Sequence, residues 1–517
     1  MQRKTAGQLS FLCLFFFPTV FWLAAVKKTE QFPLPKPKMV SFVNIIKSTP
    51  HKPILWGAAL VGLVLGVILA TILIRMSRSE FGGAEFKRFL RGTRIITQSA
   101  LASKTKEPKE KQITIAKIPV PTRIENYHIL LGGATGAGKS AVMRELAYGC
   151  IMRRDKCIFI DPDGDLVSKF YIPGRDLILN PYDDRSEGWT FFNEIRADYD
   201  YKRLALSIIP RGQTAEEEEW RTYGRLLFRE TARKLAKLGR PSIREVFEWT
   251  NLADPDALQK FLSGTDAESL FVGADKALAS ARFVLSGVLP EHINMPRGDF
   301  TFREWLEYDG PDAGNLFITW REDMIDSLRP LISGWADVIC SAVLSLPPSR
   351  TRRIKFFMDE LASLEKLASL EDALTKGRKH GLGIVASVQS TAQLVERYGR
   401  EKAQTLRSCF RSLIVMGGSK SDPETAEDMS KALGEHEVIR EREGRNRNSR
   451  SSGSSENDEV VKERVVSAVE VMNLPDLTGY VSFATDFPIA KVKVEYIPFK
   501  VRETPFIEKS THRLNVV

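Results

Sequence analysis

The sequence is poor in the residues that build metal sites and disulfide frameworks. It has five cysteines and six histidines in 517 residues. No two cysteines form a C-x-x-C pair, and the histidines do not cluster with them. These spacings argue against a zinc site and against a disulfide framework, and they favour buried, reduced thiols in a cytosolic body. The sequence also lacks an internal repeat.

The overall composition is that of a globular protein. Hydrophobic residues make up 43% of the chain and charged residues 27%, which predicts an ample core. The length suggests about two to four domains. The net charge of +10 suits a polyanion or an anionic membrane surface. It proves neither partner, because much of the basic excess lies near two apolar runs at the amino end.

The two apolar runs predict a membrane anchor. Residues 9–26 are rich in Phe, contain Pro18 and reach the short limit for a spanning helix, so a cleaved signal peptide stays open as an alternative. Residues 54–74 have no charge and, as a helix, match the roughly 30 Å hydrocarbon core. Gly62 and Gly66 give this second helix a small-residue face for packing against another helix.

The charges around the runs set the expected orientation. Arginines and lysines follow residue 74, which predicts a cytoplasmic carboxyl end for the second helix. If the first run also spans, both termini are cytoplasmic and the loop between is external. That loop carries six lysines, against the positive-inside pattern. Met39 is a second possible start of the protein.

A glycine-rich stretch after residue 126 fits the pattern G-x-x-x-x-G-K-[ST]. It follows a strand candidate at residues 127–131 and precedes a helix candidate from Ala141. Its residues are Gly133, Ala134, Thr135, Gly136, Ala137, Gly138, Lys139 and Ser140.

Each residue type in this stretch suits phosphate binding. Glycines let backbone N–H groups approach phosphate oxygens, and the following helix offers more N–H groups. Lys139 can reach the β- and γ-phosphates, and the Ser140 hydroxyl can coordinate Mg²⁺. The stretch therefore predicts a site for ATP and Mg²⁺; the alternative is a glycine-rich turn without a ligand.

A second motif lies far downstream, where an apolar strand at residues 354–358 ends in Asp359 and Glu360. Downstream of a phosphate loop this is the Walker B pattern, in which Asp359 holds Mg²⁺ and Glu360 polarises the attacking water. Alone the pattern is weak, because strands often end in acids. Together with Lys139 and Ser140 it predicts nucleotide hydrolysis.

Two further residues are candidates for the same reaction. Gln389 ends a strand at residues 384–388 and could sense a γ-phosphate if that strand neighbours the Asp359 strand. Arg378 lies between glycines after a helix predicted at residues 361–376, and its guanidinium could reach the nucleotide of an adjacent subunit. The alternative for Arg378 is a solvated basic turn.

The order of strands and helices predicts the domain organisation. Strands alternate with helices from residue 127, which is typical of a parallel α/β sheet. Between residues 187 and 312 the pattern becomes helical, which predicts an inserted all-α domain. The predicted parts are an anchor at 1–80, a nucleotide-binding domain at 81–186 and 313–517, the insertion at 187–312, and a disordered loop at about 440–459.

Taken together, these motifs resemble the conjugative type IV secretion coupling proteins, the TraD/TrwB-like family. The resemblance covers most of the chain from about residue 50 and is specific in the runs at 359–370, 375–379 and 180–183. It implies an α/β, RecA-like P-loop nucleotide-binding domain with an inserted all-α domain and an N-terminal transmembrane anchor, assembled as a homohexamer on the bacterial inner membrane with its ATPase body in the cytoplasm. The implied partners are single- and double-stranded DNA, the relaxase with its relaxosome, and components of the secretion channel.

Three functional hypotheses remain. The first is an ATPase that moves single-stranded DNA during conjugation. The second is a docking receptor for relaxosome or channel proteins, in which the ATPase only gates assembly. The third is another ring motor, such as a chromosome-segregation translocase or a protein-secretion ATPase. The predicted helical insertion favours the coupling family over segregation translocases. A small-molecule phosphotransferase is disfavoured, because no acceptor-pocket or lid signature accompanies the phosphate loop.

Overall fold

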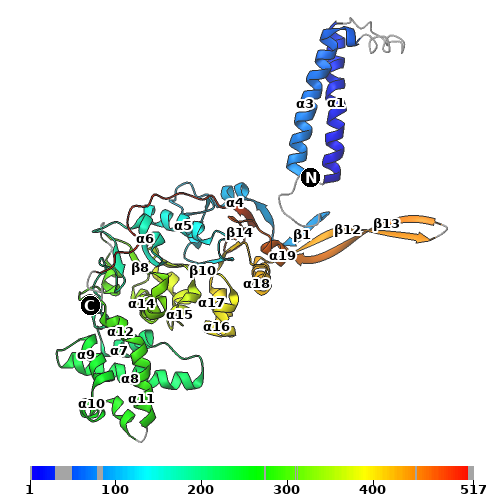
Figure 1. Cartoon of the computed structure of the whole chain (residues 1–517). Helices are drawn as coiled ribbons and strands as arrows, with labels where there is room; N and C mark the ends of the chain where they lie inside the picture. The colour runs from blue at the N-terminus through cyan, green and yellow to red at the C-terminus, as the bar shows by residue number, and fades with distance from the viewer. Residues whose placement is uncertain are drawn as a thin grey trace, which may run out of the picture. The chain divides into compact units, whose positions relative to one another are not determined.

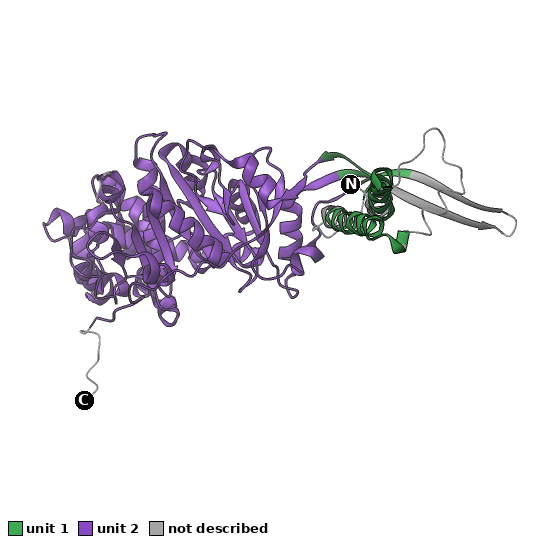
Figure 2. Ribbon diagram, turned by 90° about the horizontal axis from the view of Figure 1, so that it is seen from above, with its two compact units in different colours: residues 1–91, 437–462 green, residues 92–436, 463–517 purple. Residues whose placement is uncertain are grey.

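The computed structural model describes residues 3–29, 49–77, 86–272, 275–308, 310, 313–448 and 451–509. The chain forms two compact units (Figure 2). Unit 1 comprises residues 1–91 and 437–462, and unit 2 comprises residues 92–436 and 463–517.

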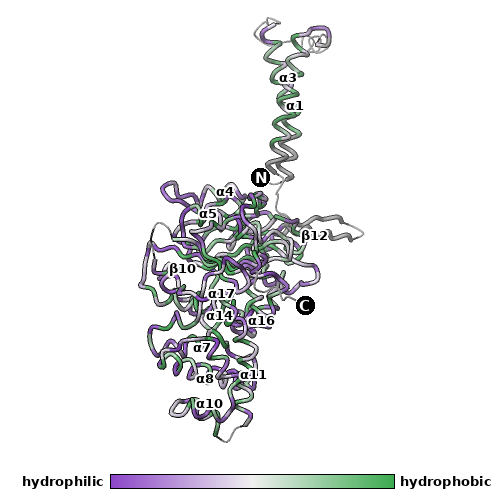
Figure 3. The backbone as a smooth tube through the Cα atoms, turned by 60° about the vertical axis from the view of Figure 1, so that its left-hand side comes forward, coloured by the Kyte–Doolittle hydropathy of each residue, from purple (hydrophilic) through white to green (hydrophobic). Residues whose placement is uncertain are grey.

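Unit 1 contains two apolar helices, α1 (Arg3–Thr29) and α3 (Pro53–Ser77), which lie side by side (Figures 1 and 3). Both are long and apolar enough to cross a membrane. A Cβ atom added to Gly62 would come within 2.6 Å of the Phe17 carbonyl oxygen, and one on Gly66 within 2.7 Å of that of Cys13. The two glycines therefore permit the close helix packing that their spacing predicted.

A third helix of sufficient length and hydropathy belongs to unit 2. It is α14 (Ile325–Ser345), and 72% of the apolar window at Glu322–Ser345 is buried in the protein. Burial on this scale identifies α14 as a core helix of the body, although the sequence analysis did not predict it.

The segment predicted to be a disordered loop at about 440–459 forms strands instead. The structure has β12 (Glu435–Asn448) and β13 (Ser451–Arg464), paired in a three-stranded sheet with β1 (Arg88–Gly92); residues 449 and 450 lie outside the described residues. Ion pairs of 2.7 Å from Arg91 to Glu437 and 2.9 Å from Lys87 to Asp458 join the strands. The prediction was wrong because it used composition, whereas backbone pairing and opposite charges across strands need no apolar core.

Unit 2 is built on a ten-stranded sheet in the order β2-β15-β14-β11-β5-β10-β9-β6-β8-β7. The strands from β11 to β7 pair in parallel, and β14 is antiparallel to both β11 and β15. The strands are β2 (Ile95–Thr97), β5 (Ile129–Gly132), β6 (Lys156–Pro162), β7 (Leu177–Leu179), β8 (Leu316–Trp320), β9 (Ile354–Met358), β10 (Leu382–Val388), β11 (Ser412–Met416), β14 (Thr478–Ser482) and β15 (Ile489–Lys493). A separate pair is formed by β3 (Thr114–Ile115) and β4 (Ile118–Pro119).

Helices cover both faces of this sheet (Figure 1). One face packs against α4 (Gln98–Thr105), α5 (Lys139–Arg153) and α6 (Asp165–Phe170). The other carries α14, α15 (Leu370–Lys376), α16 (Thr391–Tyr398) and α17 (Arg400–Cys409), while α18 (Pro423–Leu433) and α19 (Ala468–Met472) pack near β11 and β14. The predicted α/β class is therefore confirmed, and its parallel strands point their carboxyl ends to one edge.

Between β7 and β8 the described residues form helices and no named strand. They include α7 (Asp198–Ile208), α8 (Ala215–Lys237), α9 (Ile243–Phe247), the π-helix η4 (Glu248–Leu252), α10 (Pro255–Leu262), α11 (Asp275–Val288), α12 (Pro290–Ile293) and α13 (Phe302–Glu307), with 3₁₀ turns at Phe191–Glu194 and Asp266–Phe271. One apolar cluster runs from these helices through α14 to the sheet, which explains why unit 2 is a single compact unit.

The helix predicted at residues 361–376 is interrupted. Only the short 3₁₀ helix η7 (Leu361–Ser363) and α15 form there. The Glu365 N–H donates to the Ser333 hydroxyl at 2.8 Å, and the Ser369 N–H donates to the Asp337 carboxylate. Side chains of α14 thus bind the N–H groups that a continuous helix would have used, which the local sequence could not reveal.

Candidate functional site

The glycine-rich loop connects β5 to α5, at the carboxyl edge of the sheet. Its glycines adopt φ values of 158° at Gly133, 80° at Gly136 and 112° at Gly138. A Cβ atom on Gly133 would come within 2.8 Å of the Met416 side chain, and one on Gly138 within 2.8 Å of that of Leu477. The loop therefore needs glycine for both its conformation and its packing.

Lys139 starts α5 and folds back over the loop. Its side-chain Nζ donates to the carbonyl oxygens of Gly133 at 2.8 Å and Ala134 at 3.1 Å. Burial lowers the pKa of Lys139, while the nearby Glu360 and Asp359 carboxylates raise it. No side chain caps the start of α5. The Lys139 ammonium group and the uncapped amino end of the helix therefore lie together at a place where an anion would be stabilised.

The acidic pair follows β9, which one strand, β10, separates from the β5 strand that leads into the loop. Ser387 of the neighbouring β10 connects both acids, since its hydroxyl donates to Asp359 Oδ1 at 3.1 Å and accepts from the Glu360 N–H at 3.2 Å. Burial raises the pKa of Asp359, and the Ser387 hydrogen bond and Lys139 counteract that rise. Sequence reasoning missed Ser387; the signal was a lone hydroxyl in a buried apolar strand.

Glu360 combines an unusual backbone conformation with a carboxylate that lacks hydrogen bonds to the described residues. Its φ of 72° is left-handed, and its two carboxylate oxygens are buried without a hydrogen-bond partner among the described residues. Burial raises the pKa of Glu360; Lys139 lowers it, and so does Gln389, which lies close by without reaching hydrogen-bond geometry. A strained, unpartnered carboxylate is costly, which is typical of a residue whose partner arrives with a ligand.

Gln389 lies where the sequence analysis required it, because β10 and β9 are parallel neighbours. Its Oε1 accepts a hydrogen bond of 2.9 Å from the Thr135 hydroxyl of the glycine-rich loop. Gln389 therefore connects the loop with the strand beside the acidic pair, and its role as a sensor stays a prediction.

These residues line one cavity of about 630 Å³. Predicted residues at its wall are Thr135, Gly136, Gly138, Lys139, Ser140, Asp359, Glu360 and Gln389; the sequence analysis missed Ala141, Arg144, Pro162, Trp320, Glu322, Ile325, Arg329, Ser363, Asp476, Leu477 and Tyr496. The cavity is large enough for a small-molecule ligand. Of the remaining predicted loop residues, Gly133 and Ala134 hold Lys139 through their carbonyl oxygens, and Ala137 is buried and accepts from the Leu477 N–H at 3.0 Å.

Among the described residues, no group of three or more histidine, cysteine or acidic side chains could hold a metal ion. The sparse oxygen set of Ser140 and Asp359 still suits Mg²⁺, which keeps several waters and binds through one or two carboxylates plus substrate phosphates. The nearby Asp161 serves the fold instead, because its two oxygens accept from the N–H groups of Leu166 and Val167.

Arg378 is the predicted site residue that the chain does not bring to this cavity. It lies on the 3₁₀ helix η8 (Gly377–His380), which precedes β10, and therefore at the amino edge of the sheet. Its exposed guanidinium stacks on Tyr127, 3.9 Å from the ring centroid, and Arg411 lies 4.5 Å from the same ring. Within one chain, Arg378 and the glycine-rich loop therefore lie at opposite edges of the sheet.

Comparisons with known proteins agree with this geometry. Residues 112–495 match the family model described as the type IV secretion-system coupling protein DNA-binding domain. The structure resembles the unbound bacterial conjugative coupling protein TrwBdeltaN70, with 58% identity, a TM-score of 0.79, and coverage of 84% of this chain and 99% of that one. It also resembles TrwB in complex with ADP and Mg²⁺, with 58% identity, a TM-score of 0.78, and coverage of 83% and 100%.

A more distant relative is the coupling protein TraD of Escherichia coli strain K12. It is 29% identical over 467 residues, which cover 86% of this chain and 64% of TraD. The chain thus spans slightly less than two thirds of the length of this curated relative.

Proposed function

The chain belongs to the family of type IV secretion-system coupling proteins, and we propose that it is an ATPase of bacterial conjugation that links the relaxosome to the secretion channel and moves single-stranded DNA. The observation that carries the proposal is the meeting of the glycine-rich loop with the Asp359–Glu360 pair in one cavity. The nucleotide complexes of the similar protein TrwB support the same reading.

ATP and Mg²⁺ fit the residues of the cavity. The loop offers three groups to an anion: its backbone N–H groups, the uncapped amino end of α5 and the Lys139 ammonium. The carboxylates of Asp359 and Glu360 balance that charge. When bound, Mg²⁺ would neutralise charge on the β- and γ-phosphate oxygens.

The chain's own residues divide the work of hydrolysis. Lys139 exchanges the two loop carbonyl oxygens for phosphate oxygens, and the Ser140 hydroxyl and Asp359 supply oxygen ligands. Glu360, whose carboxylate oxygens have no hydrogen-bond partner among the described residues, orients water and accepts its proton. Gln389 reports the γ-phosphate to the loop through its contact with Thr135.

Arg378 would act on the cavity of a neighbouring subunit. Support comes from its exposed guanidinium at the sheet edge opposite its own loop, which a second copy can approach. A homohexameric ring satisfies this need at every interface. In this assembly residues 187–312 act as the inserted all-α domain, and residues 1–80 as an inner-membrane anchor with the ATPase body in the cytoplasm.

The test measures ATP hydrolysis by the full chain in detergent, against protein concentration, with and without single-stranded DNA. We expect turnover per subunit to rise with concentration and with DNA, and Lys139→Ala to abolish it. Turnover that ignores DNA but responds to a relaxase or a channel protein would instead favour the docking receptor. Full turnover of Lys139→Ala would refute the site.

A further inference from the structure

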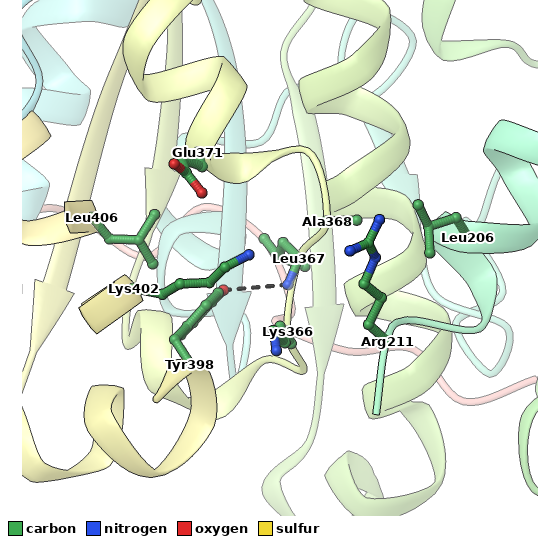
Figure 4. Close-up of a pocket in the computed structure, with 9 residues that line it drawn as sticks. All are labelled: Leu206, Arg211, Lys366, Leu367, Ala368, Glu371, Tyr398, Lys402 and Leu406. Carbon is green, nitrogen blue, oxygen red and sulfur yellow. Dashed lines mark hydrogen bonds between the residues drawn. The ribbon is translucent and has the colours of Figure 1, made fainter. Parts of the chain in front are cut away.

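Three basic side chains converge on a second cavity, which shares no lining residue with the first (Figure 4). Arg211 comes from the loop before α8, Lys366 from the extended segment before α15, and Lys402 from α17. They belong to three separate parts of the chain, so the tertiary structure alone gathers them.

None of the three cations has a hydrogen bond or ion pair with the described residues, although acids lie close by. Glu217 and Glu218 face Lys366, but they pair with Arg221 at 2.8 Å and Arg225 at 2.6 Å. Glu371 is the remaining carboxylate at the cavity wall, and it has no ion pair there. The cavity therefore holds three unpaired positive charges against one negative charge.

Without a bound anion, the three positive charges repel one another, which is energetically unfavourable. Burial lowers the pKa of Lys366, and the charges of Lys402 and Arg211 lower it further, against a smaller opposing effect of Glu218 and Glu217. Like charges repel most where water is partly excluded. A bound anion would relieve that repulsion at all three side chains.

A buried hydroxyl adds an unused donor to the same cavity. Tyr398 is 5% exposed, and its hydroxyl oxygen accepts from the Leu367 N–H at 3.3 Å (Figure 4). No described residue accepts the hydroxyl proton, and Tyr398 lines the cavity. A buried O–H group without an acceptor is costly, so an oxyanion in the cavity would satisfy it.

The size of the cavity selects a small anion. Its volume is about 160 Å³, and one water takes roughly 30 Å³ in the liquid. A hydrated phosphate group fits, whereas a base with its sugar would stay outside. We propose that Arg211, Lys366, Lys402 and the Tyr398 hydroxyl bind one phosphodiester group of a single-stranded nucleic acid. This inference rests on the proposed DNA-moving function and names a contact for it.

The test measures binding of a fluorescein-labelled oligo-dT of about 30 nucleotides to the full chain in detergent, over a series of salt concentrations. Lys366→Met and Lys402→Met should each weaken binding about three- to tenfold and reduce the slope of log affinity against log salt by about 0.7, the value for one phosphate contact on a single strand. Tyr398→Phe should weaken binding without changing the slope, because it removes no charge.

Lys260→Met is the matched control, since Lys260 is exposed on α10 and forms no ion pair with the described residues. It should bind like the wild type. An oligo-dT with an uncharged methylphosphonate backbone should bind the wild type and Lys366→Met equally. DNA-free ATP hydrolysis of each variant checks its fold.

The outcomes separate the two proposals. If the wild type does not bind DNA, the proposed function and this site both fail. If the wild type binds with a normal salt slope and Lys366→Met and Lys402→Met match Lys260→Met, this site alone is overturned. Competition by inorganic tripolyphosphate that is lost in the variants, with unchanged DNA affinity, would assign the cavity to a free phosphate and also overturn it.

Discussion

The two edges of the central sheet of unit 2 differ in how they hold charge. At the carboxyl edge, buried Lys139 and half-buried Asp359 and Glu360 line a cavity, and the Glu360 carboxylate oxygens have no hydrogen-bond partner among the described residues. At the amino edge, Arg378 is exposed and already satisfied, because its guanidinium stacks on Tyr127. The carboxyl edge therefore contains a carboxylate that lacks a partner in the free protein, whereas the arginine at the amino edge already has one.

Under the proposed function, this difference suits a division of the hydrolysis reaction between two copies of the chain. A buried, unpaired carboxylate costs stability in the free protein and is useful only when substrate arrives. A guanidinium stacked on an aromatic ring is stable in the free protein and can exchange that contact for a phosphate. Under the proposed function, the sheet would therefore separate an edge that binds the nucleotide from an edge that donates a charge to another copy.

Arg378→Ala is expected to have the largest effect, and it tests whether the two edges differ in their roles. If the amino edge serves a neighbour's nucleotide, hydrolysis should fall by about 10³ to 10⁵, the range for an arginine finger, with nucleotide affinity nearly unchanged. Steady-state turnover and nucleotide titration measure the two quantities. Mixing this variant with Lys139→Ala should restore part of the activity through mixed interfaces. Wild-type turnover of Arg378→Ala alone would remove the amino edge from the reaction.

Glu360→Gln tests the carboxyl edge. The amide keeps the shape but cannot accept the proton of water, so turnover should fall by about 10² to 10⁴. ATP should bind at least as tightly, because a buried negative charge near the phosphates is removed. Single-turnover hydrolysis and equilibrium binding separate these effects; equal losses in both would mean that Glu360 is structural.

Ser387→Ala tests whether the acidic pair needs its β10 support. Losing a hydrogen bond to a buried carboxylate costs about 1.5 to 3 kcal/mol, so turnover should fall roughly 10- to 100-fold. Ser390→Ala, which removes a hydroxyl from the cap of α16 instead, is a matched control and should retain turnover. Equal turnover of Ser387→Ala and wild type would contradict the positioning role.

At the amino edge, buried His128 should make the stability of the protein depend on pH, without a direct effect on the reaction. Its Nδ1 accepts from the Ile384 N–H, so Nε2 donates to the Leu374 carbonyl oxygen, and burial lowers the pKa of His128 to about 4. The unfolded chain takes up this proton near pH 6.5, so the free energy of unfolding should fall between pH 6.5 and about 4, by at most about 1.4 kcal/mol per pH unit. Chemical denaturation across that pH range measures the free energy of unfolding.

The control is His128→Gln, which should remove this pH dependence while lowering the overall stability. An unchanged slope of stability against pH in this variant would assign the dependence to other groups.

Local signals in the sequence predicted most of the residues that meet at the carboxyl edge of the sheet. Gly133, Gly138, Lys139 and the Asp359–Glu360 pair were identified because a phosphate loop demands special backbone conformations and a fixed order of side chains. Ser387 escaped detection because its function depends on which strand lies beside β9, and that choice belongs to the whole sheet.

The sequence by itself determined the apolar helices α1 and α3, the loop and the acidic strand end, since hydropathy and backbone conformation act over a few neighbouring residues. The tertiary structure decided what lies next to what: the β5-β10-β9 order that joins loop and acids, the opposite edge that holds Arg378, the pairing of β12 with β13, and the gathering of Arg211, Lys366 and Lys402. Contacts between distant segments follow from packing and charge summed over the entire fold, and no short stretch of sequence contains that sum.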